Sequence, residues 1–423
     1  MNTLDRNIIV YNALCKVFRE GAYASISLGE FIDGLDPRDA AYVTRVYYGV
    51  ISKSVELDYV IGKLTTKKPK PAAMIALKIG IYMLRYMDEP DYAVVNTQTE
   101  LMKKIGKREL GGFVNAVLRR SDEVKLPISD KNVAREISVN YSCPEWIVKL
   151  LLSDHGERFT REFLSAKLDE RPHVRINERK ITDKEWQKKI AGEYEKTDCG
   201  YYASVRALKP IDKTLYTVQS RSSALAAEIY ACGIADKPKI LDLCAAPGGK
   251  AVYLAYLTGC EVTACDIHPH RVDLIRSYAE RMGEKVNAVI NDATVINNEW
   301  IGAFDLVVCD VPCSGLGVIH SKPDILLSRD AEDIDALVGV QSKILRAAAA
   351  YVGKGGRLCY STCTVVNEEN EGVVNAFLKE NPNFSAEPIA FDKVKAGADG
   401  FVRIYPQSDG TDGFFVASLR RIE

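Results

Sequence analysis

The sequence predicts an α/β protein whose mostly parallel sheet follows an all-helical segment and a small α+β segment. Residues 1–125 show helical apolar spacing without strand-like alternation, and residues 216–423 alternate short apolar strands with helices. Residues 126–215 mix both patterns. A chain of 423 residues is long enough for two or three domains, each with its own core.

The helical segment is predicted from apolar positions spaced three or four residues apart. The first such face comprises Ile8, Ile9, Ala13, Leu14, Val17 and Phe18. Similar faces follow within residues 42–51, 75–86, 94–102 and 113–118. Pro37, Pro71 and Pro90 stand near the starts of segments, where proline is tolerated. We expect a compact helical bundle over residues 1–125.

The middle segment, residues 126–215, is predicted to form a small α+β subdomain. A helix is expected to begin at Cys143-Pro144-Glu145-Trp146, with proline near its first turn. Strands are expected at residues 173–177 and 201–208, with a short helix at 184–190 between them.

The last segment, residues 216–423, is expected to form a parallel sheet with helices on both faces. Strands are predicted at 239–243, 261–265, 286–290, 304–309, 357–360 and 414–419, and helices at 269–282, 336–351 and 370–379. Right-handed crossovers place the loops after such strands along one edge, where ligands bind in sheets of this kind.

Charge and cysteine content narrow the class of protein. The net charge of −1 argues mildly against a nucleic-acid binder, unless charge is segregated by face. Two basic clusters could form such a positively charged face or could be solvated helix faces. They are Lys63, Lys67, Lys68 and Lys70, and Lys103, Lys104, Lys107, Arg108, Arg119 and Arg120. The 11 cysteines, an odd number without an export signal, suggest reduced thiols in the cytoplasm. No apolar run of about 18 residues predicts a membrane span.

A cofactor site is predicted where the first strand of the sheet ends, in Leu241-Asp242-Leu243-Cys244-Ala245-Ala246-Pro247-Gly248-Gly249-Lys250. Gly248 and Gly249 let the backbone approach a ligand closely, and the following helix offers unpaired N–H groups. The run is not a P-loop, because its first glycine is missing and Ala251 replaces Ser or Thr. It does not fit G-x-G-x-x-G either.

Acidic residues follow the next three strands. Asp266 could accept both hydroxyls of a ribose, Asp292 could accept from an adenine amino group, and Asp310 ends the fourth strand. Any one of them could equally be a helix cap or a turn residue. Together, and without a phosphate-binding motif, they favour S-adenosyl-L-methionine over NAD or ATP.

Two cysteines lie just past strand ends on the same edge. Cys313 stands in Asp310-Val311-Pro312-Cys313-Ser314-Gly315, and Cys363 in Ser361-Thr362-Cys363-Thr364. Cys309 and Cys359 lie inside the strands and are expected to be core thiols. This spacing disfavours zinc, and a Cys–His hydrolase would need an imidazole base, for which only His320 is near in the sequence.

A thiol beside a methyl donor indicates a specific chemistry. Carbon 5 of cytosine is a poor nucleophile until a thiolate adds to carbon 6, after which carbon 5 can attack a methylsulfonium. Asp310 is placed to bind the polar edge of the base, and Lys250 could supply positive charge. The spacing does not tell which of Cys313 and Cys363 attacks.

The glycine-rich loop, the Pro-Cys and Thr-Cys motifs and the ending Thr411-Asp412-Gly413-Phe414-Phe415-Val416-Ala417 resemble the RsmB/NOP family of RNA cytosine-5 methyltransferases. The start of the chain resembles a NusB-like RNA-binding domain. Val311 and Thr364 depart from the family's usual Ala and Ser, but neither changes a functional atom.

The resemblance implies a class I, Rossmann-like methyltransferase domain with a mixed, mostly parallel sheet of seven strands at 216–423. It implies Cys363 as nucleophile, Cys313 as the thiol that assists release of the adduct, and Asp310 and Lys250 as cytosine ligands. The cofactor pocket would comprise Cys244, Ala245, Ala246, Pro247, Gly248, Gly249, Lys250, Asp266, Asp292 and Asp310, with Arg271 as a further candidate. We expect 16S ribosomal RNA as partner, no metal, and a cytoplasmic monomer.

Two other functions compete with this one. Methylases of adenine or glutamine amino groups typically carry an aromatic residue where Cys313 stands, so the sequence disfavours them. A non-catalytic RNA-binding factor would be expected to have lost some of the cysteines, Asp310 or the glycines, and all are present.

Overall fold

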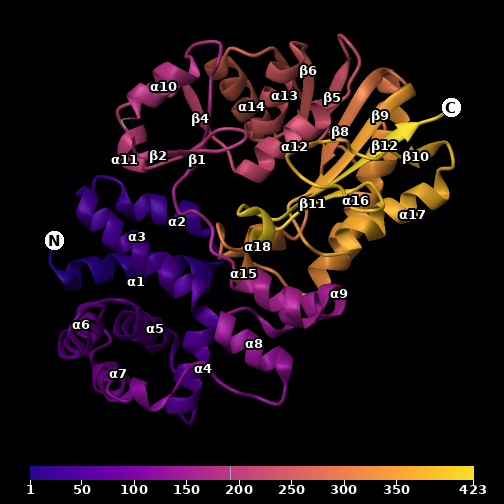
Figure 1. Ribbon diagram of the computed structural model, residues 1–423. Helices are drawn as coiled ribbons and strands as arrows, with labels where there is room; N and C mark the ends of the chain where they lie inside the picture. Colours follow the sequence, from indigo (N-terminus) through magenta and orange to yellow (C-terminus); the bar gives the residue numbers. More distant parts are fainter. Residues whose placement is uncertain (191) are drawn as a thin grey trace. The chain divides into compact units, whose positions relative to one another are not determined.

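The computed structural model describes residues 1–190 and 192–423 and divides into two compact units (Figure 1). The N-terminal unit comprises Met1–Leu164 together with Lys322–Arg329, and the C-terminal unit comprises Ser165–Ser321 and Asp330–Glu423. A division into three domains at residues 125 and 215 stays a prediction. In the described residues, no helix is both long and apolar enough for a bilayer.

The N-terminal unit is helical, as predicted for residues 1–125. Its longer helices are α1 (Thr3–Glu20), α2 (Ala24–Ile32), α3 (Pro37–Ser52), α4 (Ser54–Leu64), α5 (Pro71–Tyr86), α6 (Asp91–Lys104), α7 (Gly111–Leu118), α8 (Val133–Tyr141) and α9 (Glu145–Leu164), with α15 (Ile325–Ser328) from the distant segment. One apolar cluster joins α1 to α7, and Leu327 of α15 packs against it. Pro37 and Pro71 open α3 and α5, and Pro90 directly precedes α6.

A four-stranded antiparallel sheet begins the C-terminal unit, in the order β2 (Tyr194–Lys196), β3 (Tyr201–Ala203), β1 (His173–Ile176), β4 (Tyr216–Val218). Thr182 and Glu185 form a capping box that starts α10 (Asp183–Lys189). The predicted strand at 201–208 is wrong beyond Ala203, because the Ser204 side chain caps α11 (Val205–Leu208). Strand β4 was not expected.

The large sheet runs β10 (Phe384–Ala386), β12 (Phe414–Arg421), β9 (Val352–Thr362), β8 (Phe304–Asp310), β5 (Ile240–Asp242), β6 (Val262–Asp266), β7 (Val286–Ile290). Strands β5 to β9 pair in parallel, and β12 is antiparallel to β9 and β10. The sheet is thus mixed and mostly parallel, with seven strands on its main path; a short eighth strand, β11 (Val402–Ile404), pairs with β12.

Helices cover both faces of the large sheet because alternate strand residues point to opposite sides. Leu306 and Val308 share an apolar cluster with α12 (Arg221–Ala231), α13 (Gly249–Thr258) and α14 (Pro269–Met282). Val307 and Cys309 join the other cluster, with α16 (Glu332–Tyr351) and α17 (Val373–Glu380) (Figure 1). Helix α12 and strands β10 and β11 were not predicted.

The order of the strands fixes the place of the candidate site. From β5 the sheet continues one way to β6 and β7, and the other way to β8 and β9. Loops after parallel strands meet at the carboxyl edge, and a ligand crevice forms where the order reverses. The predicted site residues follow β5, β6, β7, β8 and β9, which all belong to this edge.

Candidate active site

The loop after β5 forms a tight glycine turn ahead of α13. Gly248 has φ of 108°, and a Cβ there would lie 3.2 Å from Cα of Ile275, so both conformation and space favour glycine. No side chain caps α13, and its first turn contains no acidic residue. Its N–H groups and positive dipole end are therefore available to an anionic group.

Two carboxylates stand at the next strand ends. Asp266 is nearly buried and accepts from the backbone N–H of His268 at 2.9 Å. Asp292 accepts from the N–H and hydroxyl of Thr294, at 2.9 and 2.7 Å, and these bonds lower the pKa of its carboxyl. Asn291 donates its backbone N–H to the carbonyl of Asp266, which ties the ends of β6 and β7 together.

Three residues beside these carboxylates were not predicted as site residues: Asn291, Ile267 and Val295. Among the described residues, the buried side-chain nitrogen of Asn291 has no hydrogen-bond partner, which suits a polar ligand. Ile267 and Val295 follow the two carboxylates closely and are more than half exposed, so they offer apolar surface to a base. Arg271, which was named from the sequence as a further candidate, lies 3.8 Å from Asp266, and its side chain is 53% exposed.

Asp242, at the end of β5, is the most perturbed acid of this edge. Burial, with the Asp310 carboxylate second, raises its pKa to about 7. Its carboxyl oxygen accepts a hydrogen bond from the N–H of Cys244 at 3.3 Å.

An ion pair joins the glycine loop to the end of β8. Nζ of Lys250 lies 2.7 Å from Asp310, and the two side chains are 17% and 22% exposed. Burial is the largest single influence and lowers the pKa of Lys250, but the charge and hydrogen bond of Asp310 and the charges of its other neighbours together outweigh burial, so the pKa is raised and the ammonium stays charged. Asp242 and Cys363 act on Lys250 in the same direction as Asp310.

A buried hydroxyl chain holds the other oxygen of Asp310. Ser361 donates to this oxygen at 3.0 Å, and the Tyr230 hydroxyl lies 2.5 Å from Ser361 Oγ. Ser361 stands opposite Asp310 in the register of β8 and β9. Tyr230 was not predicted as a site residue, because it lies on α12, which was not predicted either.

The two candidate thiols meet. The Sγ atoms of Cys313 and Cys363 are 3.4 Å apart, and both residues are partly exposed. The hydrogen bond to Cys363, with burial second, raises the pKa of the Cys313 thiol well above its usual range. Cys309 and Cys359 are fully buried core thiols, as expected.

A buried polar network, centred on Glu369, fastens the two cysteine loops. Glu369 accepts from the N–H of Ser314 at 2.8 Å, from the Ser314 hydroxyl and from the Gln341 amide at 2.9 Å. The Ser314 hydroxyl lies 2.8 Å from that of Thr364. Glu369 thereby holds residues next to both thiols, a role hidden in the sequence by its setting in an acidic run.

Backbone contacts at two glycines fix the loop of Cys363. The N–H of Gly317 donates to the carbonyl of Cys363 at 3.0 Å, and the N–H of Gly413 donates to Gly317 at 2.7 Å. A Cβ on Gly317 would lie 2.6 Å from the Gly413 oxygen and 2.7 Å from that of Cys363. The Thr411–Phe414 motif therefore supports the thiol loop.

The described residues contain no group of three or more His, Cys, Asp and Glu side chains that could hold a metal ion. The geometry offers carboxylates at the ends of β6 and β7, and at the same edge of the sheet a thiol pair and a charged pair.

Comparisons with known proteins identify the family. The family model for 16S rRNA methyltransferase RsmB/F matches residues 230–420, and that for the NusB family matches residues 5–123. The probable ribosomal RNA small subunit methyltransferase B of Bacillus subtilis (strain 168) is 33% identical over 98% of each chain. This chain belongs to the RsmB/F methyltransferase family.

Other relatives agree with this membership. The RsmB/F relative from Xanthomonas campestris, a ribosomal RNA small subunit methyltransferase B, is 28% identical, covering 96% of this chain and 94% of its own. The crystal structure of PH0851 has a TM-score of 0.82 at 23% identity over 98% of both chains. NSun6 from Pyrococcus horikoshii has a TM-score of 0.58 at 19% identity, over 71% of this chain and all of its own. At these identities, both structures support the fold.

The chain is an RNA methyltransferase of the RsmB/F family, and its cofactor is S-adenosyl-L-methionine, as the sequence predicted. The site fits this cofactor: the glycine turn and α13 suit its carboxylate, and the acceptors at β6 and β7 suit its nucleoside. The structure pairs Lys250 with Asp310 and Cys313 with Cys363. The role of each site residue stays a prediction.

Proposed function

We propose that this RsmB/F methyltransferase methylates carbon 5 of a cytosine in 16S ribosomal RNA through a covalent bond between Cys363 and carbon 6. The observation that carries the proposal is the contact of 3.4 Å between the sulfurs of Cys313 and Cys363 at the edge where Lys250 pairs with Asp310. A lone buried thiol would serve packing alone, whereas two partly exposed thiols beside a lysine suit nucleophilic catalysis.

In the proposed reaction, the Cys363 thiolate forms a bond to carbon 6, and the ring's electron pair makes carbon 5 nucleophilic. Lys250 favours the thiolate by its charge, since the two groups interact. S-adenosyl-L-methionine, when bound, would supply the methyl group to carbon 5, with its methyl–sulfur bond breaking and S-adenosyl-L-homocysteine as the leaving group. Carbon 5 then loses its proton to a base, the bond between sulfur and carbon 6 breaks, and the thiolate is restored.

Asp310 and Cys313 are assigned supporting roles. The Asp310 carboxylate is fixed by Ser361 and Lys250 and can accept a hydrogen bond from the amino group of cytosine. The raised pKa keeps Cys313 as a neutral thiol, whose S–H can donate to the sulfur of Cys363 as that sulfur leaves the ring. The cytosine must leave its stack, because a thiol has to reach the ring face.

The cofactor is assigned to the glycine loop and the two carboxylates. Residues 244–250 present the turn and the first N–H groups of α13 to its carboxylate, while Asp266 and Asp292 accept from its ribose and adenine. Lys250 and Asp310 adjoin this loop and the thiols, so they connect the cofactor end to the base end.

The names of the relatives support the RNA target. The B. subtilis and X. campestris proteins are both described as ribosomal RNA small subunit methyltransferase B, and the matching family model as 16S rRNA methyltransferase. Because the B. subtilis relative aligns over 98% of this chain, both its helical and its catalytic parts are shared.

The proposal is tested with in vitro transcribed 16S ribosomal RNA and radiolabelled cofactor. Cys363→Ala should abolish the product while cofactor binding is retained. Cys313→Ala should instead accumulate a protein–RNA complex that survives denaturing electrophoresis, since release is impaired. Bisulfite sequencing of the RNA should locate 5-methylcytosine.

Cys260→Ala is the matched control, because Cys260 is a partly exposed thiol two residues after the end of α13 and is far in sequence from both motifs. It should keep product formation. Methylation of a base other than cytosine, or full activity of Cys363→Ala, would refute the covalent mechanism. If Cys313→Ala behaves like Cys363→Ala, the division of roles between the thiols is wrong.

A further inference from the structure

The contact between Cys313 and Cys363 sets this pair apart from the other cysteines. Their sulfurs lie 3.4 Å apart, and no other cysteine pair of the described chain shows a contact between sulfurs. Cys309 and Cys359 stand on the same two strands, β8 and β9, but both are fully buried, and the Cys309 sulfur faces the Cys359 carbonyl oxygen at 3.3 Å. Neighbouring strands alone therefore do not bring two thiols together.

The backbone places both thiols at one point of the sheet edge. Strands β8 and β9 pair in parallel with Asp310 opposite Ser361. Beyond the end of β8, the N–H of Val311 donates to the Ser361 carbonyl at 3.0 Å, so the pairing continues toward the cysteine loops. Cys313 and Cys363 follow within two residues of this contact.

The thiol pair is close enough to become a disulfide. Sulfurs in a disulfide lie about 2.05 Å apart, so these two must approach from 3.4 Å by about 1.4 Å. Small side-chain rotations can supply this, while the buried network of Glu369 keeps both cysteine loops in place. Both thiols belong to partly exposed residues, so a small oxidant can reach them.

We propose that Cys313 and Cys363 form an oxidation site, which a hydroperoxide converts into a reversible disulfide that stops methyl transfer. The Cys363 thiolate attacks one peroxide oxygen, the O–O bond breaks, and the departing oxygen takes a proton, which leaves a sulfenic acid on Cys363. The Cys313 sulfur then gives up its proton and attacks the Cys363 sulfur, the S–O bond breaks, and hydroxide leaves as water. With hydrogen peroxide, two thiols are oxidised to one disulfide and the peroxide is reduced to two waters.

The surroundings assign the two steps to different cysteines. Cys363 interacts with the Lys250 ammonium, which favours its thiolate, and the thiolate is the form that peroxides oxidise. The raised pKa of Cys313 keeps its thiol protonated until the second step. The disulfide occupies the sulfur that attacks carbon 6, so the loss of methyl transfer rests on the proposed function, whereas formation of the disulfide does not.

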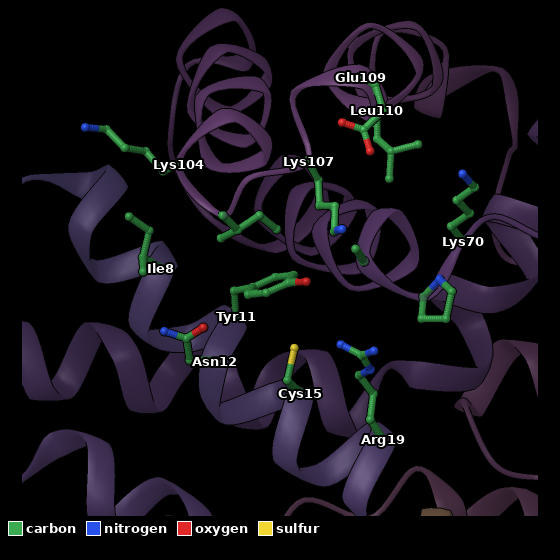
Figure 2. Close-up of a pocket in the computed structure, with 13 residues that line it drawn as sticks. Ile8, Tyr11, Asn12, Cys15, Arg19, Lys70, Lys104, Lys107, Glu109 and Leu110 are labelled. Carbon is green, nitrogen blue, oxygen red and sulfur yellow. The ribbon is translucent and has the colours of Figure 1, made fainter.

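Cys15 is the matched control, because it is an accessible thiol near cations without a second sulfur. Figure 2 shows its sulfur facing a pocket of the N-terminal unit that Arg19, Lys70 and Lys107 also line. Cys15 is partly exposed, and among the described residues that line this pocket it is the one cysteine. Peroxide can therefore oxidise Cys15 to a sulfenic acid but not to a disulfide within the pocket.

The test exposes the reduced full chain to hydrogen peroxide without RNA or cofactor. Peptide mass spectrometry should find the peptides of Cys313 and Cys363 joined and two hydrogens lighter, and dithiothreitol should separate them again. Methyl transfer should fall in proportion to the fraction of joined chains and should return on reduction. Cys15→Ser should form the joined peptide at the parent rate.

Two single variants test which thiol reacts first. In Cys313→Ser, the sulfenic acid on Cys363 should persist and be labelled by dimedone. In Cys363→Ser, dimedone labelling of Cys313 should be at least about tenfold slower, because burial still raises the pKa of the Cys313 thiol. Equal labelling rates would overturn the assignment of Cys363 as the peroxide-reactive thiol.

The oxidation site is refuted if no joined peptide forms at a peroxide dose that oxidises Cys15, or if dithiothreitol does not separate the peptides. Its failure is distinguishable from failure of the proposed function. Methyl transfer by the reduced chain without any joined peptide would leave the proposed function intact. A joined peptide in a sample that still methylates RNA at the parent rate would refute Cys363 as the nucleophile and the predicted loss of activity, while the oxidation site stands.

Discussion

Glu369 gives the sharpest test of how the thiol loops are held. It is fully buried and accepts from the N–H and hydroxyl of Ser314 and from the amide of Gln341. In Glu369→Ala, the Ser314 hydroxyl can still pair with Thr364, and Gln341 can still donate to the carbonyl of Pro312 at 3.0 Å. The N–H of Ser314 loses its acceptor.

The loss of unfolding free energy in Glu369→Ala follows from the hydrogen bonds that lose their acceptor. One orphaned buried N–H costs about 1–3 kcal/mol, and the half-satisfied Gln341 amide adds about 1 kcal/mol, so Glu369→Ala should lose about 3 kcal/mol of unfolding free energy. Glu369→Gln keeps the oxygen that faces Ser314 N–H, and its NH₂ can donate to the Ser314 hydroxyl. It should lose about 1 kcal/mol.

The effect on catalysis should exceed the effect on stability. Ser314 adjoins Cys313 and Thr364 adjoins Cys363, so loosening the network by about 1 Å should lower the single-turnover rate of Glu369→Ala about 100-fold. Glu369→Gln should stay within about fivefold of the parent, and the cofactor affinity of both should be unchanged. The measurements are urea unfolding and single-turnover methyl transfer.

A Glu369→Ala variant with the parent rate would refute the view that this network positions the thiols. Equal defects in the Ala and Gln variants would show that the negative charge matters, and not the hydrogen-bond acceptors.

Three further predictions concern other parts of the site. Tyr230→Phe removes the first hydroxyl of the chain to Asp310, so kcat should fall about fivefold, the equivalent of one hydrogen bond of about 1 kcal/mol, and a parent rate would contradict this. Asp242, with a pKa of about 7 when folded and about 3.9 when unfolded, holds a proton in the folded state that the unfolded state has lost between these values. Parent stability should therefore fall by about 2–3 kcal/mol relative to Asp242→Asn between pH 5 and pH 8 in urea unfolding, and a difference independent of pH would sink the assignment. Gly317→Ala would force the backbone at Gly413 and Cys363 apart and should lower activity about 100-fold. The control is Gly339→Ala on α16, which has open space around the added Cβ and should be active. Equal activities of the two variants would contradict the close packing of Gly317 against Gly413 and Cys363.

The sequence could predict that these candidate residues meet at one edge of the sheet, because their positions relative to the strands can be read locally. Cys313, Cys363, Asp310 and Lys250 each follow a strand or a glycine turn, and parallel strands bring such positions to one edge. The secondary structure of residues 204–208 was predicted wrongly, because the Ser204 side chain caps a helix there and ends the expected strand.

The supporting residues depend on long-range contacts that spacing does not show. Tyr230 reaches Ser361 across 131 positions, and its alanine-rich helix carries a weak apolar pattern. Glu369 lies in the run Glu368-Glu369-Asn370-Glu371, which suggests a solvated face, yet it is fully buried. The two basic clusters are separated by more than 30 residues, so only the fold shows that Lys70 and Lys107 share a pocket.

The N-terminal unit is complete only when the segment Lys322–Arg329 has been synthesised, and much of the C-terminal unit precedes that segment in the chain. Asp324 accepts from the N–H of Ala24, and Leu327 packs on the helical core, although both are encoded about 160 residues after α9 ends. At about 5–20 residues per second, the ribosome makes this segment roughly 8–30 s after the last helix of the bundle. A fragment cut at residue 164 would expose the apolar surface that Leu327 covers, so expression of the two halves as separate proteins should cut elsewhere or supply this segment.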